Sequence, residues 1–113
     1  IRINARRQVG DPGCVRDYVY VADVVRANVL AVEGRLEAPV LNVGTGVGAT
    51  TLELAEGLEA ALGVRADKEH GPRRPGDLER SVLAPNAELA AHGPSTPLAE
   101  GLAATARFFA EAR

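Results

Sequence analysis

Residues 44–49 read Gly-Thr-Gly-Val-Gly-Ala, between an apolar run at residues 40–43 and a segment with helical character. Glycines at alternate positions let a backbone approach a phosphate closely, because no Cβ stands in the way. The chemistry that this spacing could support is therefore nucleotide binding. A tight turn between a strand and a helix would use the same residues without any ligand.

The hexapeptide matches two kinds of cofactor loop in outline. Its G-x-G-x-x-[GA] pattern, with Asp67 near the end of the next candidate strand, is that of a dinucleotide fingerprint. It also resembles the first motif of class I methyltransferases, which cradles S-adenosylmethionine and in which Asp67 would hold the adenosine ribose. Asn42, however, stands where the methyltransferase motif has an acidic residue, and the following strand runs into HGPRRPGD at residues 70–77 instead of a crossover helix. The surroundings thus favour a structural turn, and we expect no cofactor-binding residue in this chain.

Arginine is the second group with a clear chemical use. The 13 basic residues comprise twelve arginines and the single lysine Lys68. Planar guanidinium groups bind phosphate oxygens in a bidentate manner that an ammonium group cannot copy. This composition suits recognition of a diphosphate, although any one arginine could equally be a solvated surface charge.

The overall composition limits the remaining possibilities. The 113 residues suffice for one modest domain, and 46% hydrophobic with 25% charged residues is an ordinary globular balance. A net charge of −2 argues against nucleic acid as a partner, and no apolar run is long enough to span a membrane. Cys14 has no second cysteine to pair with, so we expect a cytoplasmic protein. Cys14, His70 and His92 lack the spacing of metal ligands, so no metal is expected.

The elements that must position these groups alternate between strands and helices, which predicts an α/β fold with short strands and about four helices. Strands are expected at residues 1–5, 17–21, 40–43 and 64–69, and helices at 22–34, 50–63, 85–91 and from Thr96 onward. Thr50 and Glu53 fit a capping box, Gly63 can end that helix, and Thr96 can cap the last one. The apolar stripes of the three longer helices are Ala22, Val25, Val29 and Val32; Leu52, Ala55, Leu58 and Leu62; and Leu98, Leu102, Ala106 and Phe109.

Four stretches occur in a specific order: GCVRDYVYVADVVRA (13–27), VLNVGTG (40–46), PRRPGDLERSVLAP (72–85) and PLAEGLAATARFF (97–109). Together they resemble the C-terminal, substrate-binding part of the extended Rossmann-type short-chain dehydrogenases. The match is to the NAD-dependent nucleotide-sugar epimerases and dehydratases, in particular the subgroup that acts at C4 of UDP-glucose. In that family NVGTG is a strand and turn, and another glycine loop, near the N-terminus, binds NAD. One departure is HGPSTP (92–97), where the family usually has Gly-Trp-x-Pro, and the missing aromatic should weaken packing of the last helix.

The resemblance implies a parent enzyme that interconverts UDP-glucose and UDP-galactose by transient oxidation at C4, with their N-acetylated forms as further candidate substrates. Its catalyst would be a Tyr-x-x-x-Lys pair acting with NAD. Neither Tyr18 nor Tyr20 has a lysine four residues later, so no catalytic residue is expected here and the chain alone should be inactive. The sequence also begins at Ile1 and contains no methionine. We therefore expect residues 1–113 to be a C-terminal fragment whose N-terminal NAD-binding half is missing, from an enzyme that forms a homodimer.

The resemblance also implies five substrate-binding residues. Arg16 and Arg74 would contact the diphosphate, and Asp77 would accept a hydrogen bond from the ribose or orient an arginine. Ser81, four residues after Asp77, would line the sugar pocket, where a small residue leaves room for an N-acetyl group. Ile3 belongs to a strand whose backbone would border the uracil. The alternatives are surface charges for the arginines and a plain edge strand for Ile3. Asp77 could instead cap the short segment that follows it, and Ser81 could merely be a cap or face solvent.

Two other functions remain open on the sequence alone. The chain could be a methyltransferase fragment that uses the loop at residues 44–49. It could also be a non-catalytic sugar-nucleotide or interaction module, which would need neither cofactor loop nor catalytic pair.

Overall fold

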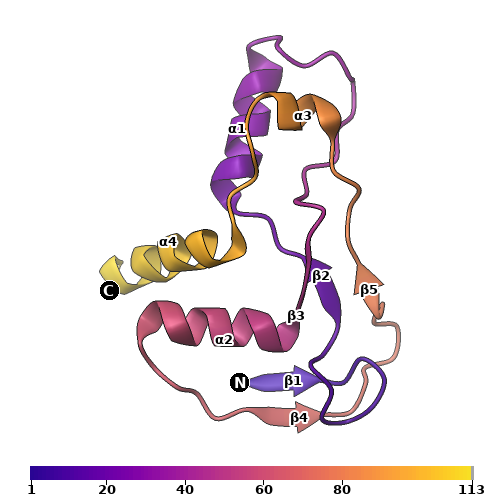
Figure 1. Ribbon diagram of the computed structural model, residues 1–113, viewed down its shortest axis with the longest axis vertical. Coiled ribbons are helices and arrows are strands. Elements are labelled where there is room, and N and C mark those ends of the chain that lie inside the picture. The colour runs from indigo at the N-terminus through magenta and orange to yellow at the C-terminus, as the bar shows by residue number, and fades with distance from the viewer. Residues whose placement is uncertain (113) are drawn as a thin grey trace.

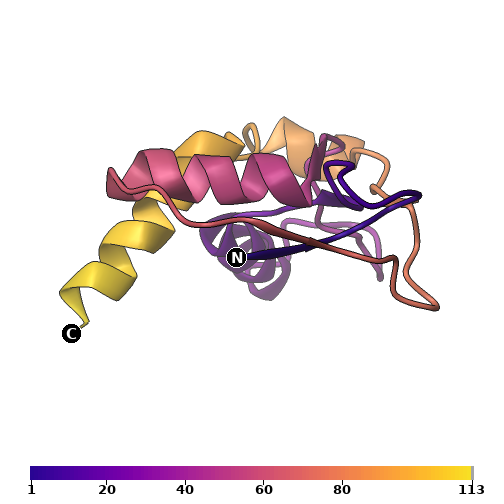
Figure 2. The same cartoon turned by 90° about the horizontal axis from the view of Figure 1, so that it is seen from below.

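The computed structural model describes residues 1–112 and shows a thin, flat chain (Figures 1 and 2). Its extents are 46 × 35 × 19 Å and its radius of gyration is 16.2 Å. A compact domain of this length would have a radius of gyration of about 13 Å. The chain therefore spreads its elements over a layer instead of enclosing a deep core. No helix within residues 1–112 combines the length and the apolar character that crossing a membrane requires.

Five short strands form two small sheets. Strands β1 (Arg2–Asn4) and β4 (Glu69–Gly71) pair in parallel, with Ile3 opposite His70. In the other sheet β2 (Val15–Asp17) lies between β3 (Gly48–Thr50) and β5 (Arg80–Ser81). Strand β2 runs antiparallel to β3 and parallel to β5 (Figure 1). The mixed α/β class expected from the sequence is confirmed.

Four helices complete the fold: α1 (Val21–Val32), α2 (Thr51–Leu62), α3 (Ala87–Ala91) and α4 (Leu98–Glu111). The predicted capping box is confirmed, since Thr50 Oγ1 accepts from the Glu53 N–H at 3.1 Å and Glu53 accepts from the Thr50 N–H at 2.7 Å. Gly63 ends α2 in the left-handed conformation. Helix α2 packs on α4 so closely that a Cβ at Gly57 would lie 2.5 Å from Leu102 Cδ1.

The start of α4 corrects one expectation. Pro97, not Thr96, is the N-cap residue, and no side chain caps this helix. Thr96 instead donates its N–H to Asp23 at 2.8 Å and its hydroxyl at 3.1 Å. Asp23 thus links the segment before α4 to α1.

The predicted strands are displaced from their expected positions. The strand expected at residues 17–21 is β2, which ends at Asp17, and the strand expected at 64–69 is β4, which begins at Glu69. Residues 40–43 form no strand, and Val40 is 84% exposed. Valine-rich segments have strand propensity, but a strand also needs a neighbour to supply its hydrogen bonds. Within residues 1–112 no segment pairs with residues 40–43.

The buried core is small. Its side chains are mostly alanines, and Ile3 in β1 is the largest one that is fully buried. The valine stripe of α1 forms as predicted but is uncovered, with Val25 54% and Val32 90% exposed. The buried face of this helix is carried instead by Asp23, Ala27 and Leu30. One face of α1 therefore remains apolar and open to solvent.

Candidate functional site

The glycine loop folds around the carboxylate of Asp17. Thr45 donates its N–H to the two carboxylate oxygens at 2.9 and 3.1 Å and its hydroxyl at 2.6 Å. Gly46 donates its N–H at 2.9 Å, and Leu83 donates from the segment after β5 at 3.3 Å. Burial raises the pKa of Asp17, but these hydrogen bonds outweigh it and hold the pKa below its usual value. The chain's own carboxylate thus occupies N–H groups that a phosphate would need.

Close packing explains the glycines of this loop. A Cβ on Gly46, which has a φ of +74°, would lie 2.5 Å from Pro85 Cγ. A Cβ on Gly44 would lie 2.8 Å from two atoms of Leu83. Both neighbours belong to the segment that follows β5. The glycines therefore allow two segments of the same chain to meet, as a structural turn requires.

Arg16 and Ser81 lie opposite each other on the parallel strands β2 and β5. Arg16 Nη1 donates to the carbonyl oxygens of Val15 and Leu78, each at 2.8 Å. These two bonds fix the guanidinium beside the segment that enters β5. Ser81 is exposed at the end of the same strand.

Arg74 and Asp77 form a turn between β4 and β5. Arg74 Nε lies 3.1 Å from Asp77 Oδ2, and the Asp77 N–H donates to the Arg74 carbonyl at 3.2 Å. The Arg74 side chain remains 68% exposed. Because Arg16 reaches the carbonyl of Leu78, next to Asp77, four of the five predicted site residues gather along this edge of the sheet. They are Arg16, Arg74, Asp77 and Ser81.

Ile3 lies apart from these four residues. Its side chain is fully buried in β1, so only its backbone could meet a ligand. Strand β1 pairs with β4, which leads into the turn of Arg74 and Asp77. Strand β4 therefore connects the sheet of β1 and β4 to the turn that carries Arg74 and Asp77.

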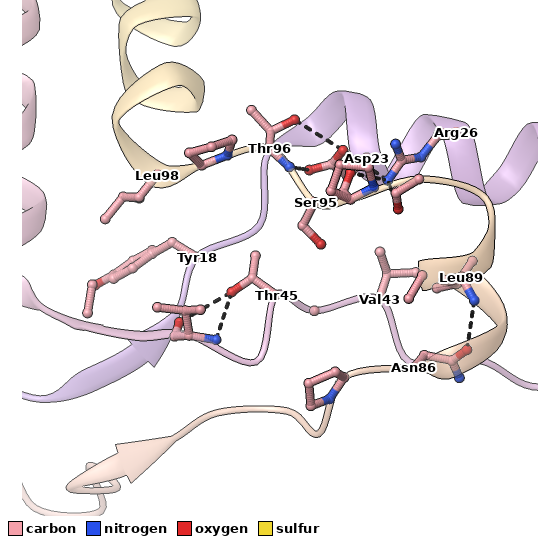
Figure 3. A pocket seen from close by; sticks show the side chains of 18 residues that line it. Tyr18, Asp23, Arg26, Val43, Thr45, Asn86, Leu89, Ser95, Thr96 and Leu98 are labelled. Carbon is pink, nitrogen blue, oxygen red and sulfur yellow. Dashed lines mark hydrogen bonds and ion pairs between the residues drawn. The ribbon is translucent and has the colours of Figure 1, made fainter.

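Two cavities of about 530 Å³ each open elsewhere on the chain. The one in Figure 3 lies between α1, α3, residues 93–98 and the glycine loop, and Ser95 points into it. Its wall contains the stretch in which the sequence lacks the expected aromatic residue. The second cavity borders α4 and includes Phe108 and Phe109. None of the five predicted site residues lines either cavity.

The charged side chains around the cavity of Figure 3 are already paired. Asp23 accepts from Thr96 and lies 3.4 Å from Arg26 Nη2. Asn86 Oδ1 accepts from the Leu89 N–H at 3.0 Å, which caps α3. A cavity whose charged side chains are paired with each other and whose wall is largely apolar gains little from a charged ligand.

Lys68, the single lysine, is held in an ion pair. Its Nζ lies 2.6 and 2.7 Å from the two carboxylate oxygens of Glu59, so this ammonium group is not free to assist a tyrosine. Within residues 1–112 no three side chains of His, Cys, Asp or Glu come together as a metal site would require.

Sequence reasoning missed the role of Asp17. Its only signal was position, because side chains alternate along a strand and Asp17 must leave β2 on the face opposite to Arg16. Which groups it meets there depends on the path of residues 44–46 and 83. No local pattern reveals that path.

Comparison with known proteins places the chain among epimerases. No family model matches it. It is 42% identical over 102 residues to a UDP-glucose 4-epimerase of Mycolicibacterium smegmatis, covering 88% of this chain and 33% of the relative. It is 39% identical over 97 residues to a probable UDP-arabinose 4-epimerase of Oryza sativa, covering 81% and 23%. The chain thus spans about a third or less of the length of these relatives.

Solved structures show the same relationship in three dimensions. The Thermus thermophilus UDP-glucose 4-epimerase in complex with NAD superimposes with a TM-score of 0.87 at 43% identity, over 100% of this chain and 36% of that one. The Thermotoga maritima UDP-glucose 4-epimerase with UDP-glucose gives 0.78 at 35% identity, over 98% and 35%. In sequence and in fold, the chain belongs to the NAD-dependent epimerase/dehydratase family of extended short-chain dehydrogenases and corresponds to a C-terminal portion of those proteins.

Proposed function

We propose that this chain is the nucleotide-sugar-binding portion of an enzyme that inverts C4 of a UDP-sugar with transiently reduced NAD. The names of its relatives support the activity. The observation that carries the proposal is the meeting of Arg16 with Leu78, beside the Arg74–Asp77 pair. It brings two guanidinium groups to one exposed edge, as a diphosphate would require.

The two arginines contribute in different ways. Nη1 of Arg16 is held by two carbonyl oxygens, so the fork is oriented before a ligand arrives. The remaining donors of this planar group are then available to phosphate oxygens. Arg74 is more exposed and is oriented by Asp77. A fixed arginine loses less side-chain entropy on binding than a free one, which favours affinity.

Asp77 and Ser81 would contact the sugar side of the ligand. Asp77 can keep Arg74 oriented and accept a hydrogen bond from the ribose. Ser81 is small and exposed on β5, so it leaves room for a substituent at C2 of the hexose. We therefore propose that N-acetylated UDP-sugars are accepted together with UDP-glucose and UDP-galactose. Ile3 would contribute only its backbone, at the uracil.

A second portion of the enzyme would supply the chemistry. We propose that it binds NAD, carries the Tyr-x-x-x-Lys pair, and covers the valine stripe of α1 and residues 40–43. Exposed apolar side chains on α1 and at Val40 support such a partner, because burying them removes apolar area from water. The chain alone would then bind no NAD and catalyse nothing. A homodimeric, cytoplasmic enzyme is proposed on the family resemblance alone.

The test is ligand binding by the complete protein that carries this chain. We expect UDP to bind, NAD to bind at a separate site, and UDP-glucose to be converted to UDP-galactose. S-adenosylmethionine should leave the melting temperature unchanged, since a ligand that binds the folded state would raise it. Absence of UDP binding would refute the proposal, and stabilisation by S-adenosylmethionine would favour the methyltransferase alternative.

A further inference from the structure

We propose that Asp17 is a positioning residue of the nucleotide-sugar site: its carboxylate joins the glycine loop to the segment after β5 and thereby holds Ser81 opposite Arg16. This inference rests on the proposed function, because it assigns Arg16 and Ser81 to the ligand. Asp17 itself would touch no substrate. It would act through the strands that carry the two contacts.

The pairing of β2 with β5 is short, so a further contact is needed to hold the two strands in register. Its register includes only Val15 with Arg80 and Arg16 with Ser81. After Ser81, the next backbone N–H that bonds to β2 is that of Leu83, and its acceptor is the Asp17 side chain at 3.3 Å. The carboxylate therefore continues, by a side-chain contact, a ladder that the backbone alone ends after two residues.

The glycine loop holds that carboxylate from the other side. Three groups donate to it at 2.6 to 3.1 Å: the N–H and the hydroxyl of Thr45 and the N–H of Gly46. Gly46 in turn lies against Pro85 of the segment after β5. Strand β2, the loop and the segment at residues 83–85 thus meet at one charged group. Loss of the charge leaves several part-buried N–H groups without a strong acceptor.

Asp23 provides a matched control within the same chain. It too accepts from the N–H and hydroxyl of one threonine, Thr96, at 2.8 and 3.1 Å. It fastens α1 to the segment before α4 and has no contact with β2 or β5 among its hydrogen bonds. A substitution of Asp23 therefore reproduces the structural damage without disturbing the proposed site.

The experiment measures UDP affinity by calorimetry in the complete protein for Asp17→Asn, Arg16→Ala and the double variant. Asparagine is nearly isosteric but replaces one acceptor oxygen with a donor that faces N–H groups. We expect Asp17→Asn to raise the Kd of UDP about tenfold, a change of ~1.4 kcal/mol. In the double variant we expect little further loss of UDP affinity beyond that of Arg16→Ala, because Asp17 would affect UDP binding through the placement of Arg16.

Asp23→Asn should lower thermal stability about as much as Asp17→Asn does, and should leave the Kd of UDP within about twofold of the parent value. The inference would be overturned if the losses of UDP affinity in Asp17→Asn and Arg16→Ala multiply in the double variant. It would also be overturned if Asp17→Asn leaves the Kd of UDP unchanged. If the parent protein itself fails to bind UDP, the proposed function fails instead, so the two failures are distinguishable.

A milder pair of variants keeps the inference testable if Asp17→Asn does not fold. Thr45→Val removes the hydroxyl that donates to Asp17 Oδ1 at 2.6 Å and accepts from the Val47 N–H at 3.0 Å, and keeps the backbone donors of the loop. Thr96→Val removes the equivalent hydroxyl at Asp23 Oδ1. We expect Thr45→Val to weaken UDP binding by about threefold and Thr96→Val to leave it unchanged. Equal effects of the two substitutions would contradict a positioning role.

Discussion

Arg16 and Ser81 stand opposite each other on two parallel strands that are 65 positions apart in the sequence, in a register of only two residue pairs. The arginine is fixed by backbone carbonyls, whereas the serine is exposed at the strand end. A ligand that contacts the guanidinium with its phosphates would place its sugar near the serine. The predictions below follow from this pair and from the contacts that maintain it.

Replacing Arg16 or Arg74 with alanine in the complete protein should weaken UDP binding by about 1.5–3 kcal/mol, as expected for hydrogen bonds to charged groups. Lysine should restore only part of the affinity, because a point charge replaces a planar fork. Arg35→Ala is the control, since Arg35 pairs with Glu33 on the surface. Calorimetry should find its UDP affinity unchanged. If both alanine variants also bind UDP normally, neither arginine holds the diphosphate.

Substituting Ser81→Tyr should discriminate between substrates. The ring would occupy the space proposed for an N-acetyl group at C2. We expect kcat/KM for UDP-N-acetylglucosamine to fall by about tenfold or more, and that for UDP-glucose to fall much less. Ser81→Ala is the size-matched control and should preserve both activities. Equal losses on the two sugars would remove Ser81 from the pocket.

The capping box of α2 should contribute measurably to stability. Thr50→Ala removes the acceptor of the Glu53 N–H and should cost about 1 kcal/mol in the free energy of unfolding. Thr50→Ser keeps the hydroxyl and should restore most of it. Chemical denaturation measures both variants. A Thr50→Ser protein as unstable as Thr50→Ala would show that the methyl group, not the cap, matters at this position.

Acid should destabilise the fold through its hydrogen-bonded carboxylates. Burial raises the pKa of Asp11, but backbone N–H groups of Arg6, Arg7, Gln8 and Gly13 outweigh it and hold the pKa well below its usual range. A carboxylate with a lowered folded-state pKa stabilises the protein above its unfolded pKa and loses this as the pH falls. Stability should therefore be level at neutral pH and decline below about pH 4. Asp11→Asn should flatten this decline, which thermal melts across pH would reveal.

The valine stripe of α1 should behave differently in the isolated chain and in the complete protein. Val29→Lys should make residues 1–113 less prone to associate, because a charge interrupts an exposed apolar face. The same change should destabilise the complete protein if the stripe is covered there. Asn28→Lys, on a neighbouring exposed position, should have neither effect. Light scattering and thermal melts distinguish the two outcomes.

The sequence predicted local features well and contacts between distant segments poorly. The capping box at Thr50 and the left-handed Gly63 depend on neighbours within a few residues, and both are confirmed. Thr96 also looked like a cap, but Asp23, 73 positions away, takes its donors. Residues 40–43 are rich in β-branched valine, as a strand would be, yet find no partner within the described chain. In each failure a long-range neighbour, or the lack of one, decides the outcome.

The candidate site divides in the same way. Arg16, Arg74, Asp77 and Ser81 came from a family resemblance, and their meeting at one sheet edge depends on the pairing of β2 with β5. Asp17 went unnoticed because its partners, Thr45, Gly46 and Leu83, are spread over two other segments. A hydrogen-bonded carboxylate leaves no periodic signal in a sequence. Only the folded backbone shows which donors surround it.

The pairing of β1 with β4 affects how the chain folds during synthesis. The backbone nitrogen of Ile1 donates to the Asp67 carbonyl, 66 positions later in the sequence. At ribosomal rates of about 5–20 residues per second, β1 must wait roughly 3–13 s for its partner to be made. Throughout that interval the side chain of Ile3, fully buried in the finished fold, is exposed to water. Strand β1 therefore becomes stable only after β4 has been made, and chaperones that bind nascent apolar segments have time to act on it.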